Sequence, residues 1–539
     1  MMSGRTRRDF LRRVGQVGGA GPLLALMGAL DLAVSSDSPR VPFEPPRPAD
    51  FALTGRAAAR VVILGAGIAG LACAYELGKA GYQCTLLEAQ PRFGGRNFSV
   101  RGGTVHTDLN GNTQTAAFGP GLYLNAGPAR IAQWMLTVDY CRELGVPLEI
   151  FVNDNAATYC YQEKAGMTPG NPVRRRAAKA DTYGYISELL AKATDQGALD
   201  NQLTAEDKDR LLDFLGDFGN IGDRVPNDPD HSWAYTGGKA RGCTTWPGAT
   251  GTPGVPDGPV PSLSTVLSYD LGDTFSLETD YEDAMVMLQP VGGMDAIPAA
   301  LARAVGPGKI QLGCQVTSVT DRPDRVSVNY RDGAGRDQLL EADYCIATLP
   351  PNLMARLPHN LGPGVQRGLT TFRPVNVGKI GLEYRERWWE TENRIFGGIT
   401  ETDLDIEQIW YPSSGLGSTE GVLLGYYNSG ERARSYDPLS PAAREALALD
   451  QGQKIHGPRY RVDLASSFSI AWARAPFIEG GWQHIPGHPE DPVYAPLNAA
   501  AGRVYFAGDW LSHEVSWQHG AFSSARKTVT ALHTRTLST

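Results

Sequence analysis

The chain is poor in cysteine and has no apolar run long enough to cross a membrane. Its 539 residues include seven cysteines without a CxxC pair or metal-ligand spacing, and the odd count argues against a complete disulfide framework. Cys73, Cys84 and Cys345 fall in apolar segments, where we expect buried thiols. The apolar stretch from Leu23 to Leu30 is too short to span a bilayer, so we expect no stable membrane anchor.

Positive charge is in the minority, with 50 Lys and Arg residues against 58 Asp and Glu residues. The formal net charge is −8, with no long basic run beyond the N-terminus, which argues against nucleic acid as a partner. The sequence has no internal repeat, catalytic triad or metal cluster, and His106, His513 and His519 are isolated in it. With 42% hydrophobic and 20% charged residues the composition is globular. A chain of 539 residues exceeds what one core usually holds, so we expect two or three intertwined domains.

The first 40 residues resemble an export signal. The stretch TRRDFLRR is similar to a twin-arginine signal and precedes a weakly apolar segment. We therefore expect residues 1–40 to direct export to the periplasm or the medium, and residues 41–56 to form a linker. A disordered basic tail on a cytoplasmic protein is the alternative.

A dinucleotide-binding motif follows this segment. Val61–Leu64 is predicted as a buried parallel strand, and Gly65, Gly67 and Gly70 form the GxGxxG turn that opens a helix. The first glycine permits the tight turn, the second lets the backbone approach a pyrophosphate, and the third lets the helix pack on the strand. A second strand ends in Glu88, whose carboxylate can accept both ribose hydroxyls of an adenosine. Together these features predict a bound dinucleotide rather than an empty Gly-rich turn.

A second pair of glycines, Gly94 and Gly95, indicates which dinucleotide binds. They follow the ribose acid directly, where a nicotinamide domain needs no such loop. The stretch EAQPRFGGR resembles the E-A-x-x-R-x-G-G-R motif of flavin amine oxidases. Arg503–Ala521 resembles that family's last segment, with Tyr505–Asp509 similar to its Y-F-A-G-E. The resemblance covers most of residues 57–535 and implies FAD as the cofactor.

The resemblance also implies the fold class and the domains. We expect an α/β protein with a Rossmann-like FAD-binding domain, an α+β substrate domain and a helical domain. The FAD-binding domain is expected to be discontinuous, over residues 57–125, 281–350 and 491–535. The helical domain is expected at 126–280 and the substrate-binding domain at 351–490.

Further cofactor contacts are implied by the same resemblance. In addition to the motif glycines and Glu88, the residues assigned to FAD are Gly94, Gly95, Arg96, Gly127, Val316, Gly508, Asp509, Trp517 and Ala521. Asp509 stands where the family has a glutamate, so its reach toward a ribityl hydroxyl is shorter. Trp482 falls where covalently flavinylated relatives have a cysteine, and no cysteine follows Cys345. We therefore expect noncovalent FAD.

Arg130 and Tyr426 are the predicted carboxylate ligands. Arg130 lies in NAGPAR near the start of a predicted helix, Ala129–Leu144, and resembles the arginine with which L-amino acid oxidases hold the substrate carboxylate in a bidentate fork. Tyr426 resembles a tyrosine that gives the carboxylate a second hydrogen bond. We prefer it to Tyr427, which points to the opposite face of a strand. An arginine that only forms a salt bridge is the alternative for Arg130.

Three further side chains are assigned by resemblance. Lys379, on the predicted strand Gly378–Tyr384, is similar to a lysine bonded through a water to flavin N5, so we expect a catalytic role. Trp410 resembles an aromatic beside the substrate side chain, and Trp517 one that walls the substrate against the flavin. The alternatives are a solvent-facing lysine for Lys379 and a core tryptophan for Trp410.

The reaction implied is oxidative deamination of L-α-amino acids, with apolar or aromatic side chains preferred. Hydride transfer from Cα to FAD N5, followed by hydrolysis and reoxidation by O2, gives a 2-oxo acid, ammonia and hydrogen peroxide. A monoamine or polyamine oxidase, an amino acid monooxygenase, and a flavoprotein without turnover stay open as alternatives. A homodimer is expected by analogy alone.

Overall fold

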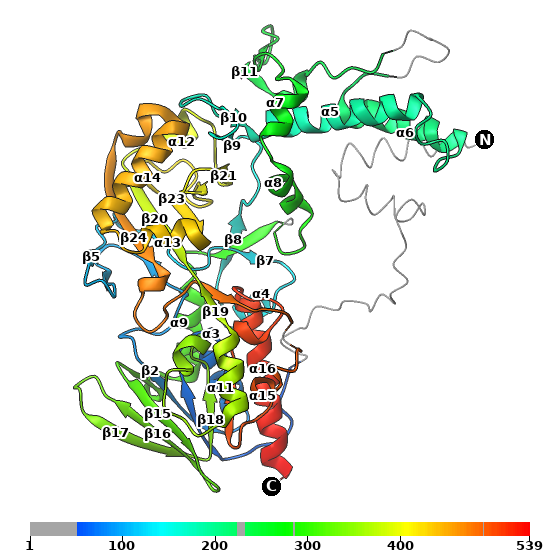
Figure 1. Cartoon of the computed structure of the whole chain (residues 1–539). Coiled ribbons are helices and arrows are strands. Elements are labelled where there is room, and N and C mark those ends of the chain that lie inside the picture. Colours follow the sequence, from blue (N-terminus) through cyan, green and yellow to red (C-terminus); the bar gives the residue numbers. More distant parts are fainter. Residues whose placement is uncertain (1–50, 224–231, 284–285, 489, 539) are drawn as a thin grey trace. The chain divides into compact units, whose positions relative to one another are not determined.

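The computed structural model describes residues 51–223, 232–283, 286–488 and 490–538, and many of its elements are labelled in Figure 1. The chain divides into two compact units. Residues 154–285 with 400–402 belong to the smaller unit, and residues 44–153, 286–399 and 403–539 to the larger one. The predicted export signal and most of the predicted linker lie outside the described residues. Within the described ranges, no helix is both long and apolar enough to cross a membrane.

A five-stranded parallel sheet organises the cofactor-binding part of the larger unit. Its order is β14–β2–β1–β18–β26, and each neighbouring pair is parallel. Its strands come from distant parts of the chain: β1 (Arg60–Leu64), β2 (Gln83–Glu88), β14 (Ile310–Leu312), β18 (Tyr344–Ala347) and β26 (Val504–Phe506). The arrangement confirms the predicted Rossmann-like α/β fold class.

The sheet is covered on both faces, as parallel sheets are. Helix α3 (Ile68–Lys79) links β1 to β2, is buried along most of its length, and packs with α9 (Ala296–Val305) and α16 (Gln518–Ser538). Val62 and Leu64 of β1 belong to a separate apolar cluster that contains residues of β15–β18, α11 and β26. Cys73, Cys84 and Cys345 are buried free thiols, as predicted.

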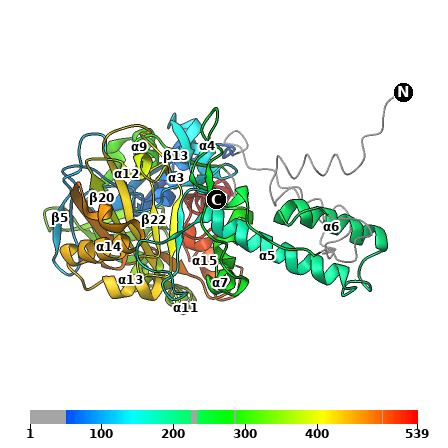
Figure 2. The same ribbon diagram turned by 90° about the horizontal axis from the view of Figure 1, so that it is seen from above.

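An antiparallel sheet of the larger unit holds further side chains that were predicted for the site. In the order β22–β23–β20–β24, its strands are β22 (Gln408–Trp410), β23 (Gly421–Ser429), β20 (Val377–Tyr384) and β24 (Leu464–Ala471). Every residue of β20 is buried. Helices α13 (Gly430–Tyr436) and α14 (Pro441–His456) pack against it (Figure 2). Lys379 therefore lies on a central strand and not at an exposed edge.

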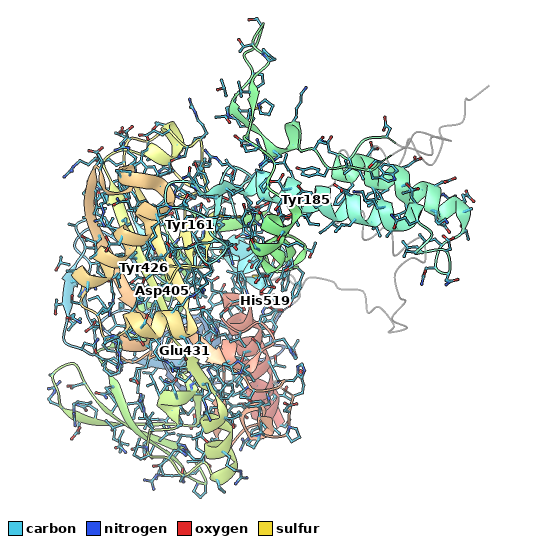
Figure 3. All side chains as sticks on the ribbon, turned by 45° about the horizontal axis from the view of Figure 1, so that its top comes forward. Tyr161, Tyr185, Asp405, Tyr426, Glu431 and His519 are labelled. Carbon is cyan, nitrogen blue, oxygen red and sulfur yellow. The ribbon has the colours of Figure 1, made fainter. Side chains whose placement is uncertain are left out.

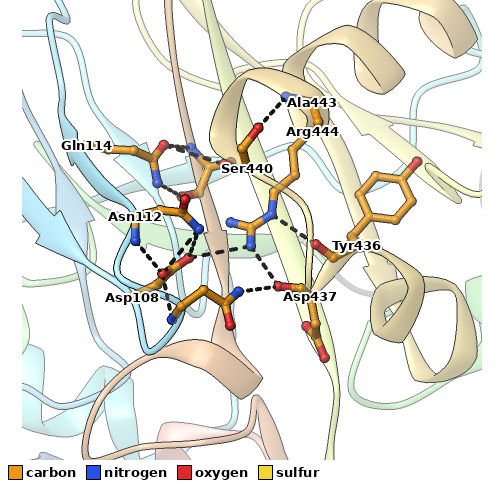
Figure 4. Close-up of polar contacts among 10 residues, drawn as sticks. Asp108, Asn112, Gln114, Tyr436, Asp437, Ser440, Ala443 and Arg444 are labelled. Carbon is orange, nitrogen blue, oxygen red and sulfur yellow. Dashed lines mark hydrogen bonds and ion pairs between the residues drawn. The ribbon is translucent and has the colours of Figure 1, made fainter.

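A buried ion pair joins α14 to the hairpin loop at Asp108. Asp108 accepts hydrogen bonds of 2.9 Å from the backbone N–H groups of Asn110 and Asn112, and its second oxygen lies 3.7 Å from the Arg444 guanidinium (Figure 4). Arg444 also donates to two backbone carbonyls at the end of α13. Because both side chains are almost completely buried, each charge depends on the other for compensation.

We expect Asp108→Ala to lower the free energy of unfolding by about 3–5 kcal/mol, because Arg444 is left as a buried charge without its carboxylate. Urea unfolding followed by far-UV circular dichroism measures this loss. Asp324→Ala is the matched control, since Asp324 forms an exposed pair with Arg325, and it should change stability by less than about 0.5 kcal/mol. Equal effects of the two substitutions would contradict the role given to the buried pair.

The smaller unit is mainly helical. Helices α5 (Arg175–Asp195) and α6 (Ala205–Gly219) run side by side (Figure 2) and pack around an apolar cluster that includes Leu212, Leu215 and Trp233. Its short strands and helices are β9 (Tyr159–Tyr161), β10 (Val173–Arg174), β11 (Cys243–Thr245), β12 (Val255–Pro256), α7 (Leu263–Ser268), α8 (Gly272–Ser276) and, extending from Ile399, β21 (Ile399–Thr402).

Residues 126–153, predicted as the start of the helical domain (126–280), lie in the larger unit. β7 (Ile131–Ala132) and β8 (Leu148–Phe151) pair antiparallel with the two sides of β13 (Met287–Pro290), which ties this stretch to the larger unit. The smaller unit begins at Asp154 instead. Apart from residues 281–285 and 400–402, the residues predicted for the FAD-binding and substrate-binding domains lie together in the larger unit.

The larger unit contains several further short elements. They are β3 (Ser99–Val100), β4 (Val105–Thr107), β5 (Thr113–Thr115), β6 (Leu124–Asn125), α4 (Leu136–Glu143), β15 (Gln315–Asp321), β16 (Val326–Arg331), β17 (Asp337–Ala342), α10 (Pro351–Met354), α11 (Pro363–Thr371), β19 (Arg373–Val375), α12 (Trp388–Thr391), β25 (Trp482–His484) and α15 (Ala495–Asn498). Among them, β15, β16 and β17 form an antiparallel meander.

Candidate active site

A cavity of about 500 Å³ lies within the larger unit, at the carboxyl ends of the parallel strands. Ligands of open α/β sheets bind at this edge. Most of the predicted site residues line it: Gly65, Gly67, Glu88, Gly94, Gly95, Arg96, Gly127, Arg130, Val316, Lys379, Trp410, Gly508, Asp509, Trp517 and Ala521. Gly70 and Tyr426 are the two that do not. The fold thus brings together residues of the early segment 65–130, the late segment 508–521 and the antiparallel sheet.

The glycine turn has the geometry of a phosphate cradle. Gly65 has a φ of +97°, which L side chains rarely adopt, and a Cβ on Gly70 would lie 2.1 Å from the carbonyl oxygen of Gly65. Gly70 therefore acts by close helix packing and not by lining the cavity. A Cβ on Gly67 would meet no protein atom within 4 Å, because it would point into open space. Gly67 is also the residue before α3, whose first N–H groups attract an anion.

We expect Gly67→Ala to leave the fold intact and to weaken dinucleotide binding at least about tenfold, the effect of roughly 1.4 kcal/mol. The new methyl group clashes with no protein atom but occupies the space where a pyrophosphate approaches the backbone. Gly78→Ala on the same helix, also free of neighbours within 4 Å, is the control. The visible absorbance per chain, read beside the far-UV circular dichroism spectrum, measures the effect. Equal flavin content in the two variants would contradict this role for Gly67.

Glu88 is buried at the end of β2 and is held by backbone N–H groups. Its Oε2 accepts from Ala66 and its Oε1 from Gln90, both at 2.8 Å. Burial raises the pKa of Glu88, while these hydrogen bonds and the charge of Arg92 act in the opposite direction. The carboxylate is therefore fixed in orientation beside the glycine turn, as a ribose-binding acid must be.

Arg96 and Asp509 face each other across the cavity wall. The Arg96 guanidinium contacts both carboxylate oxygens of Asp509 and also donates to the Gly481 carbonyl oxygen at 2.9 Å. The Ser516 N–H donates to Asp509 at 3.0 Å, although Ser516 has a φ of +77° that a serine rarely adopts. Asp509 thus fixes both the double-glycine loop and the segment that leads to Trp517.

Lys379 is a buried cation in this cavity. Its Nζ donates to the carbonyl oxygen of Gly127 and lies 4.6 Å from the centre of the Tyr427 ring and 5.2 Å from that of Trp410. Burial, and then the charge of Arg130, lowers the pKa of Lys379 to about 7. A lysine with such a pKa can hold or release a proton near neutral pH.

Arg130 lies beside the same indole ring. Its guanidinium carbon is 4.9 Å from the centre of the Trp410 ring, and its Nη1 donates to Asn153 Oδ1 at 2.5 Å. The Trp410 indole N–H donates to Gln408 at 2.8 Å, which fixes the ring beside Arg130 and Lys379. A helix was predicted over Ala129–Leu144, but Arg130 does not lie in one. The strand β7 follows Arg130 directly and pairs with β13. Helix α4 begins only at Leu136.

The structure places Tyr427, and not the preferred Tyr426, at the cavity. Tyr427 is the direct partner of Lys379 across β20 and β23, so the two side chains share a face of the sheet, and Tyr427 lines the cavity. Tyr426, labelled in Figure 3, points to the other face and is fully buried. Its ring centre lies 5.2 Å from that of Tyr436 on α13.

Several cavity residues were missed from the sequence. Trp472 lines the cavity and donates its indole N–H to the carbonyl oxygen of Ala126 at 2.9 Å. Gln518 also lines it and donates to Asn97 at 2.6 Å. The Gly480-Gly481 pair before Trp482 was a visible signal for a close backbone approach, whereas Trp472 carries no motif.

Residues 68–533 match the family described as flavin containing amine oxidoreductase. The chain belongs to this family. Among its relatives is the putative L-amino-acid oxidase YobN of Bacillus subtilis (strain 168), 24% identical over 86% of this chain and 92% of the relative. The L-amino-acid oxidase of Gloydius blomhoffii is 26% identical over 85% of each chain.

Solved structures of amine oxidoreductases have the same fold. Cyclohexylamine oxidase from Brevibacterium oxydans IH-35A superimposes with a TM-score of 0.58 and 15% identity, over 89% of this chain and 99% of that one. Wild-type putrescine oxidase bound to putrescine superimposes with a TM-score of 0.56 and 19% identity, over 90% and 100%. At these identities the likeness defines the fold alone.

Membership of the flavin amine oxidoreductases implies a flavin cofactor and a small-molecule substrate oxidised with oxygen, and the cavity fits a flavin dinucleotide. The open space beside Gly67 suits a pyrophosphate, and the fixed carboxylate of Glu88 suits ribose hydroxyls. Lys379, on β20 of the antiparallel sheet, lines the same cavity.

Proposed function

We propose that this flavin amine oxidoreductase is an FAD-dependent L-amino acid oxidase. It would convert an L-α-amino acid, O2 and water to a 2-oxo acid, ammonia and hydrogen peroxide. The observation that carries the proposal is the position of Arg130. Its guanidinium lies in the cofactor cavity, against the ring of Trp410, which also contacts Lys379.

Arg130 is proposed to bind the substrate carboxylate. An arginine presents its N–H groups in a planar fork that matches two carboxylate oxygens. Asn153 fixes the side chain from one side through its hydrogen bond to Nη1. Tyr427 replaces Tyr426 as the candidate for a second contact to the substrate, since it lines the cavity opposite Lys379.

Lys379 is proposed to hold or transfer a proton near the reacting atoms. When bound, the flavin supplies the two-electron acceptor for the amino acid and the electrons that reduce O2. Lys379, with its pKa lowered to about 7, can donate a proton or orient a water in the dry interior of the cavity. Trp410, Tyr427 and Trp517 line the cavity beside it, which favours apolar or aromatic substrate side chains.

Noncovalent binding of FAD is part of the proposal. Cys314 is the cysteine that lines the cavity within the described residues, and it lies beside the ribose acid, since its N–H donates to the Glu88 carbonyl oxygen at 2.7 Å. Burial raises the pKa of the Cys314 thiol, which makes it a poor nucleophile. Heat or acid denaturation should therefore release the yellow cofactor completely into the supernatant.

The proposal is tested by anaerobic reduction of the purified yellow protein. L-phenylalanine, D-phenylalanine and phenethylamine are added separately while the flavin absorbance near ~450 nm is followed. Bleaching by L-phenylalanine alone is expected, because only that ligand offers both the carboxylate and the correct hand at Cα. Bleaching by phenethylamine but not by L-phenylalanine would overturn the proposal in favour of an amine oxidase. An amide product in place of the 2-oxo acid would indicate a monooxygenase.

A further inference from the structure

Three side chains of types that can bind metals lie together on the surface of the larger unit. They are His488, Glu490 and, from a later segment of the chain, His513. One donor atom from each of His488, Glu490 and His513 lies within 4.8 Å of the other two. The His513 Nε2 and Glu490 Oε1 atoms are 2.5 Å apart, and the rings of His488 and His513 are 6.3 Å apart. All three side chains are exposed, so solvent reaches them directly.

This donor set has the chemistry of a transition-metal site. Two imidazoles and one carboxylate suit Zn²⁺, which binds four ligands in a tetrahedron with bonds of about 2.0–2.2 Å. Donor atoms around such an ion are roughly 3.3 Å apart. Exposed side chains can reach this spacing by small rotations from their present positions. We propose that His488, Glu490 and His513 bind one divalent cation of the zinc class, with water in the fourth position.

The surroundings of Glu490 favour its ionised carboxylate, which is the form that binds a metal ion. The hydrogen bond from His513 lowers the pKa of Glu490 below its ordinary value, so the carboxylate is ionised at neutral pH. A cation bound at this site would replace the hydrogen bond and take the ionised carboxylate as a ligand.

The position of the three ligands links two segments that line the active-site cavity. His488 and Glu490 follow residues 477–483, which line the cavity, and His513 stands between Asp509 and Trp517, which also line it. A cation held by all three would fix these segments to one another outside the cavity. We expect it to slow hydrogen exchange in the backbone of residues 512–517.

The experiment is a titration of the flavin-loaded enzyme, prepared without a polyhistidine tag, with Zn²⁺ and with Co²⁺. Calorimetry with Zn²⁺ should give one site per chain, and Co²⁺ should give the visible absorption of a tetrahedral site. All of these titrations use protein that carries Cys243→Ser. Among the described residues, Cys243 is the free thiol that is not buried. His513→Ala and His488→Ala should each weaken binding more than about tenfold, since one of three protein ligands is lost.

His484→Ala is the matched control, because His484 is an exposed histidine of the neighbouring strand that lies outside the cluster. It should leave both titrations unchanged. Zn²⁺ binding that survives His513→Ala and His488→Ala together, or no binding to the parent protein at micromolar Zn²⁺, would overturn the proposal. Since the readouts are heat, absorbance and hydrogen exchange, they do not depend on which substrate the enzyme oxidises.

Discussion

Arg130→Ala should lower kcat/KM for L-phenylalanine by about 30-fold to several thousand-fold. This range corresponds to roughly 2–5 kcal/mol, the cost of removing one partner of a buried charge pair. Because the carboxylate is bound alike before and during the reaction, most of the loss should appear in KM. Arg130→Lys keeps the charge but not the planar fork, so its kcat/KM should fall between those of Arg130→Ala and the parent. Steady-state peroxide production measures all three.

Two controls separate this effect from damage to the site. Arg367→Ala removes an exposed arginine far from the cavity lining and should leave kcat/KM unchanged. The absorbance spectrum of Arg130→Ala should still be that of a fully loaded flavoprotein, because Arg130 is not proposed to contact the cofactor. An unchanged kcat/KM in both Arg130→Ala and Arg130→Lys would contradict the carboxylate-binding role of Arg130. It would also contradict the proposed L-amino acid oxidase activity, which depends on that role.

Binding of a carboxylate ligand should be coupled to uptake of a proton by Lys379. The pKa of Lys379 is lowered to about 7 by burial and by the charge of Arg130. A carboxylate on Arg130 offsets that charge, so the pKa of Lys379 should rise in the complex. Below pH 7 Lys379 is charged in both states and no proton moves, whereas just above pH 7 the ligand binds the protonated form better. The Kd should therefore increase as the pH rises through this window.

Benzoate is a suitable probe, because its own carboxyl group stays ionised across the window. Calorimetry in two buffers with different ionisation enthalpies should report uptake of up to one proton per benzoate bound. Lys379→Met should abolish this uptake and flatten the pH dependence of the Kd. The same substitution should lower the rate of reoxidation by O2 on the order of 10²-fold, the lower range for loss of a proton-transfer group. Proton uptake that persists in Lys379→Met would assign the coupling to another group.

The local parts of the site could be predicted from the sequence because their signals are local. The strand, the glycine turn, helix α3 and Glu88 lie within one short β–α–β unit, and apolar runs and glycine spacing define each of them. The resemblance of the C-terminal segment likewise identified Gly508 and Asp509, which line the cavity.

The errors concern pairings between distant segments. The choice between Tyr426 and Tyr427 depended on the register of β23 against β20, and no residue near either tyrosine encodes which of them faces Lys379. The helix predicted from Ala129 failed because its first residues pair with β13, far along the chain. His513 is isolated in the sequence, and only folding brings it beside His488 and Glu490.

The strand order of the parallel sheet also determines at what stage of synthesis the protein can bind its flavin. During synthesis β1, β2, β14 and β18 leave the ribosome well before β26, the edge strand that pairs with β18. Gly508, Asp509 and Trp517, which complete the cavity, follow that last strand. A nascent chain lacking them presents an open half-site, so tight flavin loading must follow synthesis of β26 and of the segment after it. The rate of loading should then depend on free flavin in the compartment where the chain folds.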